Sequence, residues 1–277
     1  MIEQVRRIAA FCAGDSGGNP AGVWIGTALP DDGTMGRVAA AVGYSETVFA
    51  APLDDGWRVR YFSPESEVPF CGHATIALGA ALALERGAGT YALQTNHAQV
   101  TVEGAEAGGA ITASLVSPPA TGSAAPAAIV NEALALFGYT HDDLDPRMPP
   151  ALANGGAGHL ILALKTRAAL GAMRYDLDAG RTLMRREGWA TIAIVHAESA
   201  TRFHARNPFA SGGVYEDPAT GAAAAALAGY LREIGWPATA IDIVQGEDMG
   251  VPCHLHAEAL PGQGSAVRVS GSARVMA

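Results

Sequence analysis

The chain has 277 residues, 49% of them hydrophobic and 16% charged, which supplies a sizeable core and argues against disorder. Its formal net charge of -9, with no basic block, argues against nucleic acid or an anionic membrane surface as a partner. The apolar runs are shorter than the ~20 residues that a membrane-spanning helix needs. We therefore expect a soluble protein with neither a membrane nor a nucleic-acid partner.

Three scattered cysteines, Cys12, Cys71 and Cys253, form neither a CxxC pair nor a regular disulfide pattern. This usage indicates a reducing compartment, and we expect the protein in the cytoplasm. Cys71 and His73 are spaced like two metal ligands, but no second pair follows at a usable distance. We therefore expect no metal.

The first half contains segments rich in β-branched residues that alternate with polar ones, which predicts strands. Asp31 and Asp32 can cap an amphipathic helix that extends to about Val42. A longer helix is expected at 73–86, with Gly87 after its end. The strands are expected at 5–11, 21–25, 47–51, 57–62, 91–95, 98–103 and 109–114.

Residues 117–126 are rich in proline, glycine, serine and alanine without periodicity, and we expect a linker there. Beyond it the pattern predicts short helices at 129–137 and 177–188 and a long helix at 220–234. Strands are expected at 160–164, 190–196, 201–205, 241–245, 254–258, 266–270 and 273–276.

Both halves contain the same series: a strand with aromatic residues, a loop, a turn of small residues and a helix that is apolar all round. Such a helix is buried by its surroundings, so we interpret each half as a bent, mostly antiparallel sheet around one central helix. The predicted fold class is α+β, with domains at 1–117 and 118–277 and the last strand free to return to the first half. Because helix N-termini attract anions, the two helix starts together predict a cleft for a small carboxylate.

Several short motifs occur in an order that is shared with one protein family. They are Gly18-Asn19-Pro20-Ala21-Gly22-Val23, Ser45-Glu46-Thr47-Val48-Phe49, Tyr61-Phe62-Ser63-Pro64, Glu67-Val68-Pro69-Phe70-Cys71-Gly72-His73-Ala74-Thr75, Glu216-Asp217-Pro218-Ala219-Thr220-Gly221-Ala222 and Gln245-Gly246-Glu247-Asp248-Met249-Gly250. In this order and at these spacings the chain resembles the phenazine-biosynthesis-like (PhzF) family over nearly its whole length.

The resemblance implies the diaminopimelate epimerase-like fold, with two pseudo-symmetric domains, each a curved, mostly antiparallel β-barrel around a central helix. It places the active site in the cleft between them. It also implies a homodimer and a cofactor-free isomerase that acts on a small carboxylate-bearing molecule.

The resemblance makes Glu46 the proton-transferring residue and places His73 and Asp217 at the active site. The residues alone leave other interpretations open. Glu46 is also explained as an exposed carboxylate at a strand edge. His73 is also explained as a helix-start histidine bonded to its own turn, and Asp217 as the N-cap of the helix that follows it.

Substrate contacts are expected at Asn19, Gly72, Thr220 and Gly221. Asn19 has a turn role as its alternative. Gly72 and Gly221 let backbone N–H groups approach an anion, because a side chain there would intrude. Cys71 is interpreted as a small buried hydrophobic residue, outside the catalytic set.

Two departures from the family pattern leave the substrate open. Ala222 stands where the family commonly has serine, and Val251-Pro252-Cys253 stands where Arg-Pro-Ser is usual. Besides the isomerase, two hypotheses remain. One is an amino-acid racemase or epimerase of the same fold that uses Cys71, and the other is a non-catalytic metabolite-binding protein that keeps the cleft.

Overall fold

The computed structural model describes residues 1–276. Two compact units make up the chain: Met1–Val116 with the residues from Ser270 onward, and Ser117–Val269. Both contain helices and mixed sheets, which confirms the predicted α+β class. None of the described helices is both long and apolar enough to cross a membrane.

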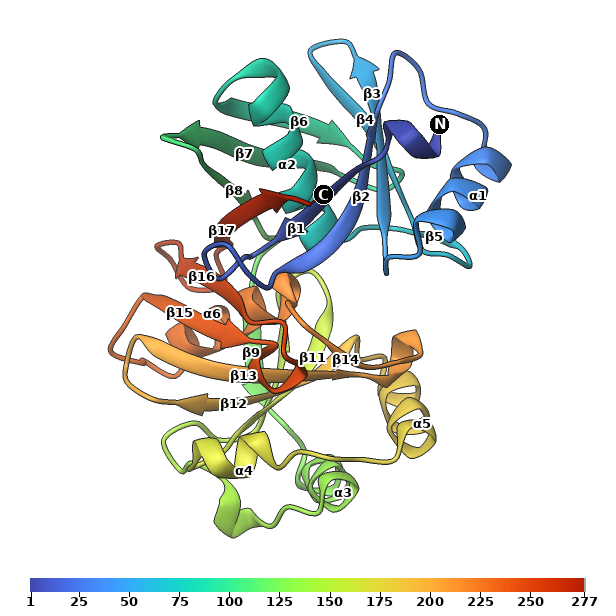
Figure 1. Cartoon of the computed structure of the whole chain (residues 1–277). Coiled ribbons are helices and arrows are strands. Elements are labelled where there is room, and N and C mark those ends of the chain that lie inside the picture. Colours follow the sequence, from blue (N-terminus) through green and yellow to red (C-terminus); the bar gives the residue numbers. More distant parts are fainter. Residues whose placement is uncertain (277) are drawn as a thin grey trace. The chain divides into compact units, whose positions relative to one another are not determined.

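The first unit is a closed ring of strands (Figure 1). Neighbours pair in the order β1-β2-β3-β4-β6-β7-β8-β17 and back to β1, and the pairs β2–β3 and β4–β6 are parallel. A short strand, β5 (Glu67–Val68), pairs with β4 outside the ring. The ring strands are β1 (Arg6–Ala10), β2 (Asn19–Ile25), β3 (Thr47–Leu53), β4 (Gly56–Phe62), β6 (Gly89–Gln94), β7 (Gln99–Ala107), β8 (Ala110–Val116) and β17 (Val267–Val275).

Helix α2 (Gly72–Arg86) fills this ring, because residues 73–83 are all buried and the helix contacts strands on every side. Its small residues let the strands come close. A Cβ at Gly104 of β7 would lie 2.2 Å from the carbonyl oxygen of Gly79 in α2. Any larger residue at Gly104 would therefore push the helix away from the barrel wall.

Helix α1 (Asp32–Val42) covers the outside of the ring. The Asp31 carboxylate accepts a hydrogen bond from the Thr34 amide at 2.9 Å, as the predicted cap requires. Met35 and Val38 of α1 pack on Phe49 and neighbouring aromatic residues of the barrel wall. The first unit thus has one helix inside the sheet and one outside it.

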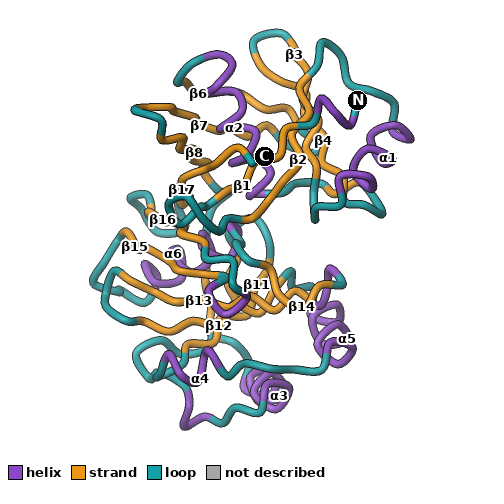
Figure 2. The backbone as a smooth tube through the Cα atoms, in the orientation of Figure 1, coloured by secondary structure: helices purple, strands orange, loops and turns teal. Residues whose placement is uncertain are grey.

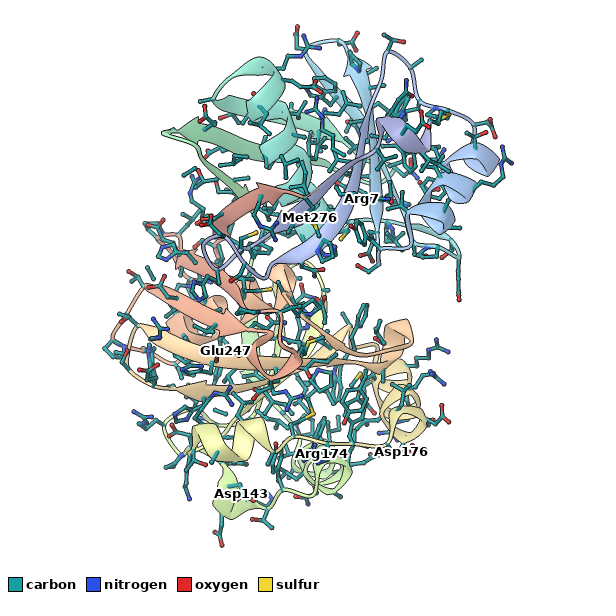
Figure 3. All side chains as sticks on the ribbon, in the orientation of Figure 1. Arg7, Asp143, Arg174, Asp176, Glu247 and Met276 are labelled. Carbon is teal, nitrogen blue, oxygen red and sulfur yellow. The ribbon has the colours of Figure 1, made fainter. Side chains whose placement is uncertain are left out.

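The C-terminus completes the first unit. The Met276 amide donates to the Arg7 carbonyl at 2.8 Å, and the two residues lie side by side in Figure 3. Strand β17 pairs with β1 and with β8, so the last residues of the chain close the N-terminal ring.

The second unit repeats the order of pairing. Its sheet runs β9-β10-β11-β12-β13-β15-β16, and the pairs β11–β12 and β13–β15 are parallel, as are β2–β3 and β4–β6. Helix α6 (Gly221–Glu233) packs against this sheet with its residues 223–231 buried. The strands are β9 (Thr121–Ala124), β10 (Ala151–Asn154), β11 (Gly158–Ala163), β12 (Thr191–Ala197), β13 (Arg202–Phe209), β14 (Val214–Asp217), β15 (Ala240–Gln245) and β16 (Cys253–Ala259).

Three helices cover the other face of this sheet: α3 (Ala127–Phe137), α4 (Arg167–Gly171) and α5 (Leu177–Glu187) (Figure 2). Alternation along the strands sorts the side chains between the two faces. Ile192 and Ile194 of β12 face the helix cluster, whereas Ala193 and Val195 face α6. The smaller inward side chains leave room for the buried helix.

Two expectations about the elements were wrong. The expected linker at 117–126 contains strand β9, which pairs with β10 despite its glycine and serine content. The two strands expected at 266–270 and 273–276 are one strand, β17, which passes from the second unit to the first. Gly271 within it looks like a break in the sequence, but pairing with neighbouring strands overrides that local signal.

Candidate active site

The start of α2 presents backbone amides and two reactive side chains. Cys71 is the N-cap residue and makes no side-chain cap, so the first amides of the helix lack intrahelical partners. The Thr75 amide and hydroxyl both donate to the Cys71 carbonyl, at 3.0 and 2.7 Å. The buried Tyr61 hydroxyl lies 2.8 Å from the Thr75 hydroxyl, and burial raises the pKa of Tyr61. This turn is therefore held firmly.

Glu46 and His73 lie together. The Glu46 Oε2 atom is 3.4 Å from His73 Nε2, and their side chains are only 15% and 8% exposed. The Ser45 hydroxyl is 3.5 Å from the same ring nitrogen. The Glu46 carbonyl accepts from the Gly22 amide at 3.1 Å, which fixes the start of β3. Glu46 is therefore not the exposed strand-edge carboxylate that the residues alone also allowed.

Cys71 contacts the same imidazole. Its Sγ atom is 3.3 Å from His73 Nδ1, and the residue is partly exposed rather than buried. Cys71 is therefore not a purely apolar residue, because its thiol also contacts the imidazole. His73 therefore contacts both a thiol and a carboxylate, and it is not bonded only to its own turn.

The start of α6 carries different groups. The N-cap residue is Thr220, so the interpretation of Asp217 as the N-cap was wrong. The Asp217 carboxylate instead accepts from the Thr220 hydroxyl at 2.6 Å. Gln245 completes the cluster, because its side-chain amide donates to the Asp217 carbonyl at 2.7 Å and to the Thr220 hydroxyl at 3.1 Å. Sequence reasoning omitted Gln245 as a site residue, although it opens the last motif.

The remaining expected contacts occupy element ends. Gly72 and Gly221 are the first residues of α2 and α6, where their amides have no intrahelical partner. Asn19 is buried at the start of β2 and pairs with Ala10, so it belongs to a strand rather than to a turn.

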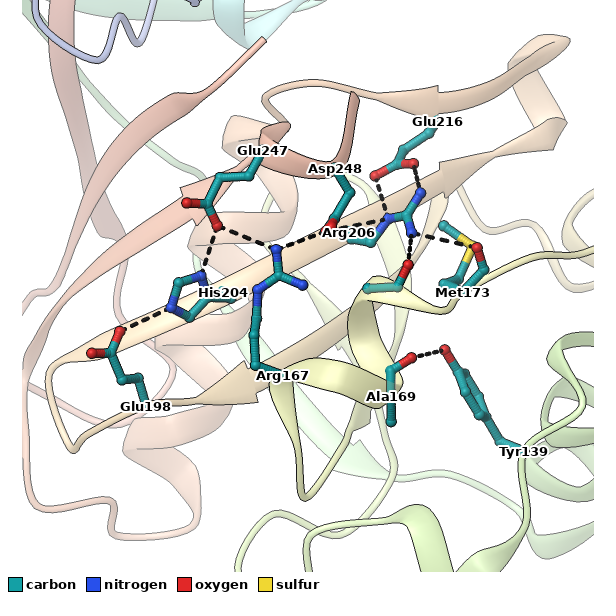
Figure 4. Close-up of polar contacts among 11 residues, drawn as sticks. Tyr139, Arg167, Ala169, Met173, Glu198, His204, Arg206, Glu216, Glu247 and Asp248 are labelled. Atoms are coloured by element: carbon teal, nitrogen blue, oxygen red, sulfur yellow. Dashed lines mark hydrogen bonds and ion pairs between the residues drawn. The ribbon is translucent and has the colours of Figure 1, made fainter. Parts of the chain in front are cut away.

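A charged network supports the strand that ends at Asp217 (Figure 4). Arg206 of β13 donates two hydrogen bonds to Glu216 of β14, at 3.0 and 2.5 Å, and both side chains are buried. Burial opposes the charge on Arg206, but the bonds to Glu216 hold the pKa of Arg206 above its ordinary value. Asp248 joins Arg206 to Arg167, at 3.9 and 2.9 Å.

A second buried polar chain crosses the interior of the second unit. Thr191 donates to Asn207 Oδ1 at 3.1 Å and must therefore accept from His159 Nδ1 at 2.8 Å. This arrangement fixes the proton of His159 on Nδ1. Burial lowers the pKa of His159 to about 4, so the imidazole is neutral near pH 7.

Comparisons with known proteins identify the chain's relatives. The family described as "Phenazine biosynthesis-like protein" matches residues 8–277. The trans-2,3-dihydro-3-hydroxyanthranilate isomerase of Pseudomonas aeruginosa is 32% identical over 282 residues, which cover 98% of this chain and 96% of that protein.

Solved structures show the same fold. A PhzF-family protein from Bacillus anthracis superposes with a TM-score of 0.86 at 20% identity, covering 99% of this chain and 96% of that one. A probable proline racemase from Agrobacterium radiobacter superposes with a TM-score of 0.63 at 12% identity, covering 98% and 90%. The relatives' names and the shared fold define the class of protein, an isomerase. The chain belongs to the phenazine biosynthesis-like (PhzC-PhzF) family, as its motifs predicted.

Proposed function

We propose that the protein is a cofactor-independent isomerase that moves a proton within a small, unsaturated or amino-substituted carboxylate. The observation that carries the proposal is the Glu46–His73 pair at the start of α2. A carboxylate can remove a proton from carbon, and an adjacent imidazole can donate a hydrogen bond to the charge that develops. The isomerase name of the Pseudomonas aeruginosa relative supports this class of reaction.

The reaction balances without a further reactant. Glu46 takes a proton from a carbon next to the conjugated system, and the electron pair of that C–H bond moves into the system. His73 and the amides around Gly72 stabilise the negative charge on the substrate oxygen. Glu46 then returns the proton to a different carbon, so the double bond shifts and the enzyme is regenerated.

The second helix start is proposed to hold the substrate. Asp217 and Thr220 form one hydrogen-bonded unit, and the amide of Gly221 follows it in α6. We assign Thr220, Gly221, Gly72 and Asn19 to substrate binding and Asp217 to the catalytic set. We place the reaction in a cleft between two pseudo-symmetric barrel domains of a homodimeric, cytoplasmic enzyme, as the family resemblance implies.

One observation favours a second candidate, an amino-acid racemase. Cys71 lies 3.3 Å from an imidazole nitrogen, which suits a thiol that exchanges a proton. A two-base racemase also needs an acid or base on the opposite face of the substrate. The start of α6 carries the carboxylate of Asp217 and the hydroxyl of Thr220 instead of a second thiol, and this difference favours the isomerase.

The test follows deuterium rather than a product. The protein is incubated in D₂O with a panel of small carboxylates that includes trans-2,3-dihydro-3-hydroxyanthranilate and several α-amino acids, and exchange is followed by NMR. We expect deuterium incorporation with a shifted double bond in an unsaturated carboxylate. Exchange only at the α-carbon of an amino acid would favour the racemase. Binding of panel members without exchange would establish a non-catalytic binding protein.

A further inference from the structure

Cys71 has no part in the proposed proton transfer, yet it belongs to a compact group of potential metal ligands. One ligand atom each from Glu46, Cys71 and His73 lie within 4.8 Å of one another. Among residues 1–276 this is the one such group of three histidine, cysteine or acidic side chains. The local sequence pattern does not indicate this group, because Glu46 directly precedes strand β3 and lies 25 residues before Cys71.

The separations suit a tetrahedral ion. With the bond lengths of Zn²⁺, two ligands at a tetrahedral angle are about 3.4 Å apart for nitrogen and oxygen and about 3.6 Å apart for nitrogen and sulfur. His73 Nε2 is 3.4 Å from Glu46 Oε2 and 3.9 Å from Cys71 Sγ. Cys71 Sγ lies nearer to His73 Nδ1, at 3.3 Å, so the side chain of Cys71 or His73 must rotate to bring all three atoms onto one ion.

The backbone that carries the three ligands is held in place before any ion binds. The Thr75 bonds hold the turn that carries Cys71 and His73, and the bond from the Gly22 amide holds the backbone of Glu46. Binding therefore requires little ordering of the protein.

We propose that Zn²⁺ binds to Glu46, Cys71 and His73 and leaves a fourth position open to solvent. The Cys71 thiol releases its proton to the buffer as the zinc–sulfur bond forms. Sulfur and imidazole nitrogen favour Zn²⁺ over Mg²⁺ or Ca²⁺, which take oxygen ligands. Resting on the proposed function, bound zinc occupies both members of the catalytic pair and inhibits the isomerase reversibly.

Binding is tested with Co²⁺ as a spectroscopic probe on the untagged, chelator-treated full chain. We expect one equivalent to produce a thiolate-to-cobalt charge-transfer band in the near ultraviolet and tetrahedral bands in the visible, and Zn²⁺ to abolish both. Cys71→Ala should lose the charge-transfer band, whereas Cys253→Ala, which removes a buried thiol of the second unit, should keep it. Glu46→Gln should keep the band and weaken binding by about 10–100-fold or more.

The proposal is overturned if no charge-transfer band forms at one equivalent, or if Cys71→Ala binds cobalt like the unchanged chain. The cobalt spectrum does not depend on any enzymatic activity. It therefore tests metal binding even if the isomerase assignment is wrong. With a verified substrate, the rate with zinc is compared with each variant's own metal-free rate. Inhibition should disappear in Cys71→Ala, persist in Cys253→Ala and reverse on adding a chelator.

Discussion

The two interior helices start in the same way, but their first turns carry different chemistry. At α2 an imidazole, a thiol and the carboxylate of Glu46 meet. At α6 the carboxylate of Asp217 accepts from the Thr220 hydroxyl, which in turn accepts from the side-chain amide of Gln245. The parallel strand pairs behind them have matching registers, Gly22 with Thr47 and His159 with Thr191. The residue before Thr47 is Glu46, and the residue before Thr191 is Ala190. The two units therefore share a backbone arrangement but differ in side chains, and only the first unit has the proposed base at this position.

A second pair of features sharpens the comparison. Each unit has an arginine–glutamate pair between two consecutive strands that precede its interior helix. In the first unit Arg60 of β4 binds Glu67 of β5, and in the second Arg206 of β13 binds Glu216 of β14. The same atoms meet in both pairs, Nε with Oε1 and Nη2 with Oε2. The side chains of the first pair are 16% and 28% exposed, and those of the second are 9% and 3% exposed. Because the two ion pairs have the same geometry but differ in burial, we expect their removal to change the free energy of unfolding by different amounts.

The largest expected effect tests the role of the proposed base. Glu46→Gln keeps the shape of the side chain but removes the base, so turnover should fall by about 10²–10⁴-fold, mainly in kcat. Glu65→Gln changes an exposed carboxylate of the same unit and should leave kcat unchanged. Steady-state kinetics on the substrate found by exchange supplies the measurement. Near-full activity in Glu46→Gln would show that the proton is transferred by His73, Asp217 or Cys71 instead.

The next effect separates the two ion pairs. Arg206→Met leaves the Glu216 carboxylate buried without its cation, which should cost about 3–5 kcal/mol of unfolding free energy. Arg60→Met should cost about 1 kcal/mol or less, because water reaches Glu67 more readily.

Urea unfolding followed by tryptophan fluorescence measures both costs. Trp24 and Trp57 report on the first unit, and Trp189 and Trp236 report on the second. Equal losses in the two variants would show that burial does not distinguish the pairs.

A smaller effect distinguishes the paired threonines. Thr191→Val leaves His159 Nδ1 and Asn207 Oδ1 without the hydroxyl that joins them, at a cost of about 1–3 kcal/mol. The Thr47 hydroxyl is buried without a hydrogen-bond partner in the described structure, so Thr47→Val should be neutral or stabilising. The midpoints of thermal unfolding of the two variants test this, and a loss of stability in Thr47→Val would contradict it.

The smallest effect is a pH dependence. The unfolded chain protonates His159 near its ordinary pKa of 6.5, whereas the folded chain does so near 4. The neutral imidazole therefore contributes stability above pH 6.5 that is lost as the pH falls toward 4, about 2 kcal/mol of it between pH 7 and 5.

His159→Asn keeps a donor for Thr191 and removes the titrating group. The variant should show a smaller loss of unfolding free energy between pH 7 and 5 than the unchanged chain does. Urea titrations at the two pH values measure this difference, and identical losses would remove His159 as the cause.

Local signals in the sequence predicted the helices that organise the fold. Both interior helices are apolar all round, and their observed bounds, Gly72–Arg86 and Gly221–Glu233, lie within one residue of those expected. The helix cap at Asp31 could also be predicted from the sequence, because it joins residues only three positions apart. The sequence pattern did not predict short strands such as β10, because their pairing partners supply most of their stability.

The site was predictable as a set of motifs but not as an arrangement. Nothing local indicates that Cys71, His73 and Glu46 meet, or that Gln245 bonds Asp217, because these contacts join segments far apart in the chain. The pairing of Arg206 with Glu216 also depends on how two strands, β13 and β14, lie against each other. A long-range contact of this kind depends on strand register, which the sequence pattern constrains only through the faces of each strand.

The C-terminal strand has a consequence for how the protein is made. Chains on the ribosome generally fold from the N-terminus, domain by domain. Here the N-terminal ring lacks one strand until residues 270–275 have been synthesised, so β1 and β8 each keep one unpaired edge until then. Strands β9–β16 of the second unit are all synthesised before residues 270–275. The first unit is therefore completed after them. Pulse proteolysis of ribosome-bound chains of increasing length should find residues 1–116 sensitive until residues 270–275 have left the ribosome, and protection in shorter chains would contradict this order.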